Sequence, residues 1–291
     1  MDILTNYTFQ IVALGSVILA VAAAPVGAFS VYKGQSLIGD AIGHSTFPGI
    51  ILAYMAFATR SPVILLAGAI AAGAASYALI QLAHRDKRLG LDANLAIFLS
   101  GFFGLGMALK SFIQGNPDYA GASQAGLGTY IFGQAAYMLE ADVLLIAVVS
   151  ALVLTLLLLF YKELKLFVFD AEYAEVVGLP CRLLNLLLLV MTIAVIGIGI
   201  KAVGAILISS FLIIPCVAAN QWSNNFARVL LLSSLIGAVS ALVGTYISTL
   251  EQGMSTGPSI ILVASLIAFF SIVFGTKGIL GNVLKRRHSH G

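Results

Sequence analysis

Asp40 and His44 are the residues of this sequence whose types and spacing point most directly to chemistry. They lie in the stretch IGDAIGHSTFPG (residues 38–49), within a chain that is mostly hydrocarbon. Residues i and i+4 of a helix project from one face, so the carboxylate and the imidazole would lie side by side. Ionisable groups inside a membrane are costly, and they normally mark ion or substrate paths. The pair is therefore a candidate site.

A carboxylate beside an imidazole suits a divalent first-row metal such as Mn, Fe or Zn. One chain supplies only two such side chains, whereas a two-fold dimer would place two Asp and two His around its axis. The absence of cysteine ligands suits a carrier, because thiolates hold Zn tightly and a carrier must release its cargo. Two other interpretations stay open: a buried Asp–His hydrogen bond that fixes helix packing, and a proton relay.

Pro48 lies four residues beyond His44. Proline has no N–H to donate to the His44 carbonyl, so it frees that carbonyl and tends to bend the helix there. We expect a helix kink next to the two candidate ligands.

The composition places these residues in a membrane protein. Of the 291 residues, 60% are hydrophobic and 9% are charged, and the mean hydropathy is +1.05. Soluble domains carry about 25% charged residues. The two cysteines, Cys181 and Cys216, are too few for a disulfide framework. The opening MDILTNYTFQ lacks a basic region, so no cleavable signal peptide is evident.

The apolar runs predict an all-α polytopic membrane protein, because a spanning helix needs about 20 apolar residues. If the second of the two spans around Lys201 is a re-entrant hairpin, eight true spans remain. No internal repeat or soluble domain is evident, so residues 1–291 form one transmembrane domain. The nine expected spans lie near residues 10–31, 36–57, 62–83, 92–113, 139–160, 183–200, 203–220, 228–249 and 258–275.

The basic residues orient these spans, because cytoplasmic loops carry an excess of Lys and Arg. With the N-terminus outside and nine spans, the C-terminus is cytoplasmic and the connection GNPDYAGASQAG, with Asp118, is outside. Of the 15 Lys and Arg residues, only Arg60, Lys110 and Lys201 then face outward. The others face the cytoplasm: Lys33, Arg85, Lys87, Arg88, Lys162, Lys165, Arg182, Arg228, Lys277, Lys285, Arg286 and Arg287.

The second informative stretch is the cytoplasmic segment KELKLFVFDAEYAEVVGLPCR, residues 162–182. Asp170 is a good helix N-cap. Gly178 suits the position just after a helix, and Pro180 prevents its continuation. These signals predict a short helix over residues 171–177.

The side chains of this short helix suit contact with a partner. Glu172 and Glu175 lie near its positive end. Ala174 and Val177 share a face with the N-cap residue, and Tyr173 lies beside them. A small amphipathic helix with an aromatic side chain can insert into a groove on a partner. An interfacial helix that only caps the bundle is the alternative.

Several catalytic and nucleotide-binding motifs are absent from the sequence. There is no G-x-x-x-x-G-K-[ST] phosphate loop, so the chain cannot bind ATP in that way. There is no H-E-x-x-H zinc protease motif and no G-x-S-x-G nucleophile motif either. None of these motifs points to an enzyme.

Four stretches resemble the membrane permease subunits of zinc/manganese/iron ABC importers. LIGDAIGHSTFPGIILAY looks like the signature of that family, and FDAEYAEVVGLP is similar to its cytoplasmic coupling segment. VGAILISSFLIIPCVAA and TGPSIILVASLIAFFSIVF match its late spans. The similarity runs over nearly the whole chain in the right order. The sequence departs from the family at GHSTF, where Gly43 and Thr46 could reshape the pocket.

The resemblance implies a multi-pass permease of a bacterial cytoplasmic membrane. It would pair with a second copy or a paralogue, bind two copies of a separate ATPase that holds the ATP, and receive metal from an extracytoplasmic metal-binding protein. It has lipid around it and no nucleic acid partner. Asp40 and His44 would carry the transmembrane Mn, Zn or Fe. The residues implied in coupling to the ATPase are Asp170, Glu172, Tyr173, Ala174, Glu175, Val177 and Gly178.

Two other functions are alternatives to a metal importer. A secondary transporter could use Asp40 and His44 for protons, but no inverted repeat is obvious, and it gives the helix at 171–177 no role. An intramembrane enzyme could use the pair for metal-assisted hydrolysis, but one chain lacks a third ligand and a base. Co-purification of an ATPase would separate the importer from the secondary transporter.

Overall fold

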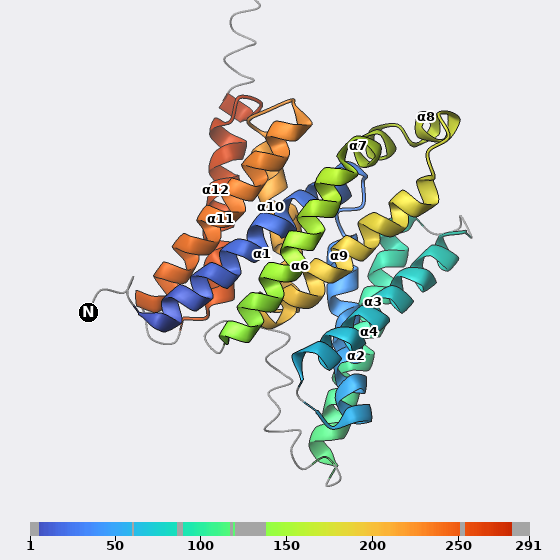
Figure 1. The fold of residues 1–291 in the computed structure, drawn as a ribbon, viewed down its shortest axis with the longest axis vertical. Coiled ribbons are helices and arrows are strands. Elements are labelled where there is room, and N and C mark those ends of the chain that lie inside the picture. Colours follow the sequence, from blue (N-terminus) through green and yellow to red (C-terminus); the bar gives the residue numbers. More distant parts are fainter. Residues whose placement is uncertain are drawn as a thin grey trace, which may run out of the picture.

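The computed structural model describes residues 6–59, 61–85, 90–116, 119, 138–250 and 254–280, and all regular elements within these ranges are helical (Figure 1). Asp118 and the basic residues 285–287, which carry part of the topology prediction, lie outside the described residues. The helices are α1 (Tyr7–Tyr32), α2 (Ile38–Phe57), α3 (Pro62–Arg85), α4 (Leu91–Gly115), α6 (Glu140–Leu159), α7 (Tyr161–Phe169), α8 (Ala171–Val176), α9 (Cys181–Val203), α10 (Ala205–Asn220), α11 (Phe226–Leu250) and α12 (Thr256–Phe274).

The structure confirms a polytopic helical membrane protein. Each of the nine segments expected from the sequence coincides with a helix. Among the described residues, seven helices are long and apolar enough to cross a membrane: α1, α3, α4, α6, α9, α11 and α12. The helix α10 has only 16 residues, and α2 carries Asp40, His44 and Pro48 in place of hydrocarbon. The count of nine spans thus stays a prediction that depends on these two helices.

Glycine allows α2 to pack directly against α3. A Cβ atom on Gly49 would lie 2.1 Å from the Gly68 carbonyl oxygen, and a Cβ atom on Gly68 would lie 2.4 Å from the Gly49 oxygen. Only residues without a side chain permit this approach. Small residues commonly form helix interfaces in membranes because they let backbones come close. The backbone of α2 is thereby fixed on the side of α3.

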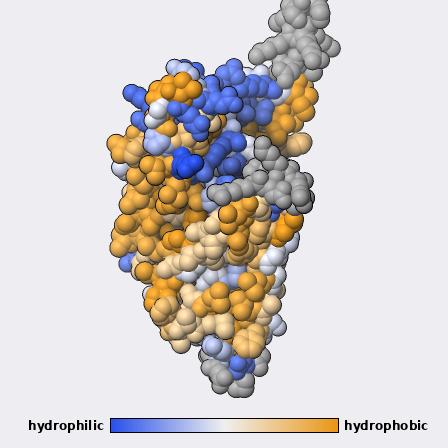
Figure 2. Space-filling model, turned by 90° about the vertical axis from the view of Figure 1, so that its right-hand side faces the viewer, coloured by the Kyte–Doolittle hydropathy of each residue, from blue (hydrophilic) through white to orange (hydrophobic). Residues whose placement is uncertain are grey.

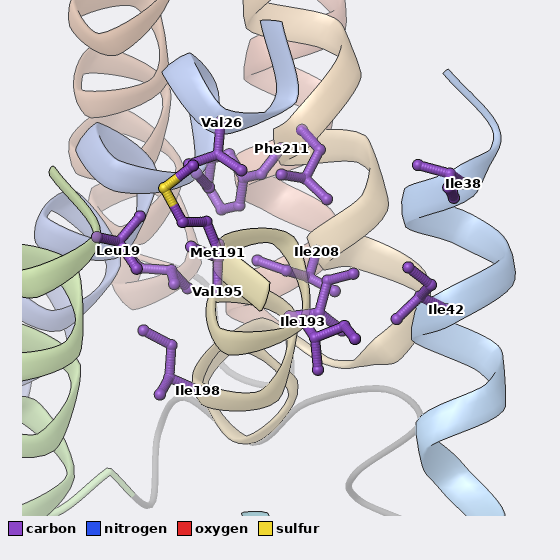
Figure 3. Packing of buried hydrophobic residues seen from close by; sticks show 14 of the residues in the cluster. Leu19, Val26, Ile38, Ile42, Met191, Ile193, Val195, Ile198, Ile208 and Phe211 are labelled. Carbon is purple, nitrogen blue, oxygen red and sulfur yellow. The ribbon is translucent and has the colours of Figure 1, made fainter. Parts of the chain in front are cut away.

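The core lies where two groups of helices meet. One group contains α1, α11 and α12, and the other contains α2, α3 and α4. The helices α9 and α10 contact both groups (Figure 1). Figure 3 shows the packing at this junction, with Leu19 and Val26 of α1, Ile38 and Ile42 of α2, Met191 to Ile198 of α9, and Ile208 and Phe211 of α10. The candidate ligands on α2 therefore rest on a closely packed junction.

The helices α7 and α8 lie together at one end of the bundle (Figure 1). Figure 2 shows hydrophilic side chains gathered at that end, above a broad belt of hydrophobic ones. The sequence predicted the helix α8 but not α7, whose nine residues precede it. Within α7, Leu164 and Phe167 are buried, so α7 is attached to the bundle by an apolar side.

Candidate functional site

The structure brings the two predicted metal ligands together. His44 Nε2 lies 3.5 Å from Asp40 Oδ1, one helical turn apart on α2. The His44 side chain is 13% exposed and the Asp40 side chain is 34% exposed. Asp40 lies in the first turn of α2, where the helix dipole favours a negative charge. The pair is thus partly enclosed and open on the side of the carboxylate.

The helix α10 contributes a hydroxyl group to this site. Ser209 Oγ donates a hydrogen bond to Asp40 Oδ1 at 3.1 Å. Ser209 is only 5% exposed. The sequence of α10 resembles a late span of the family but does not indicate a contact with Asp40. No local sequence signal links the two residues, since they are far apart in the chain.

The His44 ring is held by an aromatic neighbour. Phe103 of α4 meets it edge-on, with ring centroids 4.9 Å apart and planes at 83°. His44 Nδ1 is buried and has no hydrogen-bond partner among the described residues. The imidazole therefore keeps its Nε2 edge toward Asp40. A neutral imidazole nitrogen in this position is a common metal ligand.

Thr46 and Gly43, where the sequence departs from the family pattern, contact each other. Thr46 Oγ1 donates to the Gly43 carbonyl at 2.6 Å, and Thr46 is fully buried. The threonine hydroxyl is thus bonded within its own helix. Its hydrogen bond is not directed to Asp40 or His44.

Pro48 lies inside α2, and the helix continues beyond it to Phe57. It is packed against α4: a Cβ atom on Gly106 would lie 3.1 Å from Pro48 Cδ and 2.5 Å from Phe47 Cδ1. Gly106 therefore lets α4 approach α2 one turn from His44. The expected kink at Pro48 stays a prediction.

A single chain offers few ligands for a metal ion. Among the described residues, no group of three or more His, Cys, Asp or Glu side chains is close enough to hold one. Asp40 and His44 supply one carboxylate and one imidazole. Both suit Mn, Fe and Zn, but two ligands do not fill a coordination shell. Completion of the shell requires water or a second chain.

The helix α8 is capped as the sequence predicted. Asp170 Oδ1 accepts a hydrogen bond from the Tyr173 backbone N–H at 2.9 Å. At the other end Gly178 has φ +86°, and its N–H donates to the Glu175 carbonyl at 3.0 Å. The Leu179 N–H donates to the Ala174 carbonyl, which completes a Schellman motif. Only a residue without a Cβ adopts this φ at no cost.

The exposed side of α8 differs from the predicted one at two positions. Tyr173 and Val177 are 55% and 56% exposed, and Glu172 and Glu175 are exposed as well. Ala174, which was grouped with Val177, is fully buried, so it attaches α8 to the chain behind it. Val176, which the sequence analysis did not select, is 83% exposed.

Five aromatic rings, which we call the Phe226 cluster, attach α7 to the bundle. Phe226 begins α11, and each of the other rings has its centroid within 6.4 Å of the Phe226 centroid. The cluster thus joins the ends of α1, α7 and α11. Its other members are Phe29 and Tyr32 of α1 and Tyr161 and Phe169 of α7.

Lys33 provides a second attachment between α7 and the bundle. It follows α1, and its Nζ lies 4.8 Å from the centroid of the Phe167 ring. Nζ also donates to Asn185 Oδ1 of α9, and Asn185 Nδ2 donates to the Tyr77 hydroxyl of α3 at 2.8 Å. Burial lowers the pKa of Lys33 to about 8. The residues 34–37 then lead directly into α2.

The fold and the site define a class of protein: a polytopic helical membrane protein with an ionisable pair in its bundle and a capped helix at one end. The family model of the ABC 3 transport family matches residues 5–275. The chain belongs to this family, as a membrane permease subunit of zinc, manganese and iron ABC transporters. It is a transport subunit, not an enzyme.

Individual relatives agree with this assignment. The chain is 38% identical over 288 residues to the zinc transport system membrane protein TroC of Treponema pallidum, covering 99% of this chain and 96% of that one. It is 38% identical over 268 residues to the manganese transport system membrane protein MntC of Bacillus subtilis, covering 92% of this chain and 61% of that one. The solved structure of PsaBC from Streptococcus pneumoniae in complex with Fab matches with a TM-score of 0.83 at 27% identity, covering 94% of each chain.

Proposed function

We propose that two permease chains form the path of an ATP-driven importer for Mn, Zn or Fe ions, with Asp40 and His44 as the ligands of each chain. The observation that carries the proposal is the approach of Asp40 Oδ1 to His44 Nε2, at 3.5 Å, within a largely apolar bundle. Relatives named for zinc and for manganese transport support the substrate class.

The chemistry of the pair suits a transient ion site. An ion entering the bundle loses water, and the Asp40 carboxylate and a neutral His44 imidazole replace part of that hydration. The carboxylate is a hard oxygen ligand that suits Mn, and the imidazole is a borderline ligand that suits Zn and Fe, so the pair binds several first-row metals less tightly than thiolates would. The carboxylate also compensates part of the ion's charge, which is costly in an apolar medium. A second chain would supply the same two groups across a two-fold axis.

Energy would come from a separate ATPase, because the sequence has no phosphate-binding loop of its own. We place the contact with that partner on α8, at Asp170, Glu172, Tyr173, Ala174, Glu175, Val177 and Gly178. Its exposed Tyr173 and Val177 offer an apolar knob, and its caps keep the helix rigid. Ala174 is buried, so it would contribute by packing α8 against the rest of this chain and not by contacting the partner.

In this proposal the chain has nine spans, the N-terminus is outside, and α8 is cytoplasmic. The short helix α10 and the polar helix α2 then count as spans. The basic residues Lys33, Lys162, Lys165 and Arg182 lie near α7 and at the start of α9, the end of the bundle that carries α8. An extracytoplasmic metal-binding protein would deliver the ion at the opposite end. The membrane in this proposal is the bacterial cytoplasmic membrane.

Uptake of radioactive Mn²⁺ and Zn²⁺ into cells tests the proposal. Asp40→Ala and His44→Ala should each abolish uptake and leave the amount of protein in the membrane unchanged. Glu140→Gln is a matched control, since Glu140 is an exposed carboxylate at the start of α6 and Gln keeps an acceptor for the Tyr7 hydroxyl, so uptake should stay near normal. Near-normal uptake by either site variant would contradict the assignment of the ligands.

The energy source distinguishes the ATP-driven importer from a secondary transporter. Uptake by the importer should require a co-purifying ATPase and ATP, and it should survive a protonophore when ATP is maintained. Uptake that stops with the protonophore alone would favour a proton-coupled transporter instead.

A further inference from the structure

Ser209, on α10, is a polar residue of a second helix that contacts the candidate metal site. Its Oγ lies 3.1 Å from Asp40 Oδ1, the same carboxylate oxygen that lies 3.5 Å from His44 Nε2. An ionised carboxylate only accepts hydrogen bonds, so the serine hydroxyl is the donor. Ser209 is 5% exposed, so little water competes for this bond.

Close packing around α10 fixes where this hydroxyl lies. Leu212, one turn after Ser209, touches both α1 and α2. A Cβ atom on Gly27 would lie 1.9 Å from the Leu212 carbonyl oxygen, and a Cβ atom on Gly39 would lie 2.8 Å from Leu212 Cδ1. Gly39 immediately precedes Asp40. The backbone contact at Gly27 leaves no room for a larger residue and fixes α10 against α1, and the Leu212 side chain packs on the first turn of α2 at Gly39.

The bond from Ser209 to Asp40 joins two helices, as the bond from the Ser45 hydroxyl to the Ser76 hydroxyl does between α2 and α3. Ser240 and Ser259 each donate to a backbone carbonyl one turn earlier in the chain. Ser209 reaches a charged group on a helix distant in sequence. Hydrogen bonds to an ionised acceptor are stronger than those between neutral groups.

We propose that Ser209 is a positioning residue of the metal site, which orients the Asp40 carboxylate for a divalent cation held between Asp40 and His44. The inference rests on the proposed function of that pair. The hydroxyl occupies one lone-pair direction of Oδ1 and limits rotation of the carboxylate. The remaining lone pairs then face the ion beside His44 Nε2. Partners of this type, behind the ligands, tune metal affinity by about 10- to 100-fold.

Equilibrium binding of Mn²⁺ to the purified full-length chain, in the complex with which it purifies, tests the role. Ser209→Ala should raise the Kd for Mn²⁺ by about 10- to 100-fold. Thr and Val differ in a hydroxyl but have the same shape, so Ser209→Thr should bind nearly as the wild type and Ser209→Val should bind as Ser209→Ala. Ser210→Ala, at the next and more exposed position, is the matched control and should not change the Kd.

Co²⁺ serves as a spectroscopic probe of the same site, because its visible absorption reports the geometry of its ligands. Its spectrum should change in Ser209→Ala and Ser209→Val and be restored in Ser209→Thr. A packing role alone would lower thermal stability in both β-branched variants and leave the Co²⁺ spectrum intact. Thermal unfolding and elution volume are recorded for every variant to separate these effects.

Asp40→Ala is measured in parallel so that two failures can be told apart. If Asp40→Ala loses Mn²⁺ binding while Ser209→Ala and Ser209→Val bind within twofold of the wild type, the role of Ser209 is overturned and the metal site stands. If Asp40→Ala itself binds Mn²⁺ normally, the proposed metal site fails, and the role of Ser209 fails with it.

Discussion

Phe169, the last residue of α7, packs edge-on against Phe226, the first residue of α11, with ring centroids 5.2 Å apart and planes at 83°. Tyr32, the last residue of α1, lies 5.4 Å from Phe169 and 5.0 Å from Phe226 by the same measure. Three helix ends therefore meet at one point. A force applied to α7 would act on α1 and α11 together, and α1 leads into α2, which carries the proposed metal ligands.

Phe226→Ala should uncouple the proposed importer. The change removes the ring on which four others pack and should lower the free energy of unfolding by about 3 kcal/mol. Uptake of Mn²⁺ should fall sharply, whereas Mn²⁺ binding at Asp40 and His44 should persist. Phe270→Ala is the control, since Phe270 is an exposed aromatic residue that stacks on Phe274 of its own helix. Normal uptake by a stable Phe226→Ala protein would contradict a coupling role for the cluster.

Tyr173→Ala combined with Glu175→Arg should separate ATP hydrolysis from transport. The pair removes an exposed aromatic side chain and reverses an exposed charge on α8, without touching its caps. Association with the ATPase, or its stimulation by metal, should fall, while Mn²⁺ binding in detergent should survive. Leu158→Ala, at a 72% exposed position of α6, is the control.

Normal transport by this double variant with an intact ATPase partner would place the coupling contact elsewhere. The loops at 84–90 and 221–227 are then the next candidates. Both connect helices at the end of the bundle that the topology assigns to the cytoplasm.

The sequence predicts the bundle well because the membrane leaves few choices. A chain in lipid must satisfy its backbone hydrogen bonds within each helix, so every long apolar run becomes a helix. The helix α8 was also predictable, since Asp170 and Gly178 act through bonds within a few residues. The spacing of Asp40 and His44 likewise follows from helix geometry alone. These features depend on local sequence.

The features that sequence did not predict depend on residues far apart in the chain. The hydrogen bond from Ser209 to Asp40 spans 169 positions. Lys33 is held by Asn185, which is 152 positions away. The helix α7 carries charged and apolar residues without a cap signal, and its position depends on Phe226. These two hydrogen bonds and the position of α7 depend on tertiary packing, which no local sequence pattern predicts.

Pro48→Ala should reduce metal uptake without abolishing it. Proline has no N–H to donate to the His44 carbonyl. The packing of α4 on α2 at Gly106 can still hold the helix in place after the substitution. Uptake should fall between that of the wild type and that of Asp40→Ala in the same assay. A complete loss, with normal amounts of protein in the membrane, would give Pro48 a stronger role than helix shape.

Cysteine labelling tests the topology. In a chain without Cys181 and Cys216, which are both buried, Glu175→Cys should react with a membrane-impermeant reagent only after the cells are opened. Asp118→Cys, at a position beyond the described residues, should react in intact cells. Labelling of position 175 from outside would reverse the proposed orientation and remove α8 from the reach of a cytoplasmic ATPase.

Lys33 should make the stability of the protein depend on pH in the alkaline range. Burial disfavours its charged form and lowers its pKa from 10.5 to about 8, so the ammonium destabilises the folded state below that pH. Between pH 8 and 10.5 the unfolded chain binds a proton that the folded chain has lost. The free energy of unfolding therefore rises with pH across this window.

Lys33→Gln and Lys33→Met lack this titration, so the comparison isolates it. From about pH 7 to about pH 9.5 the wild type should gain about 2 kcal/mol of stability relative to either variant. Thermal unfolding of the three proteins in one detergent, at several pH values and constant ionic strength, measures the difference. Gln keeps a donor for Asn185, whereas Met keeps an apolar contact with Phe167. The gain should appear against both variants, because neither carries the ammonium group that titrates. Parallel curves for all three proteins would show that the Lys33 ammonium is not held at a cost, and that its contacts with α7 and α9 compensate its burial fully.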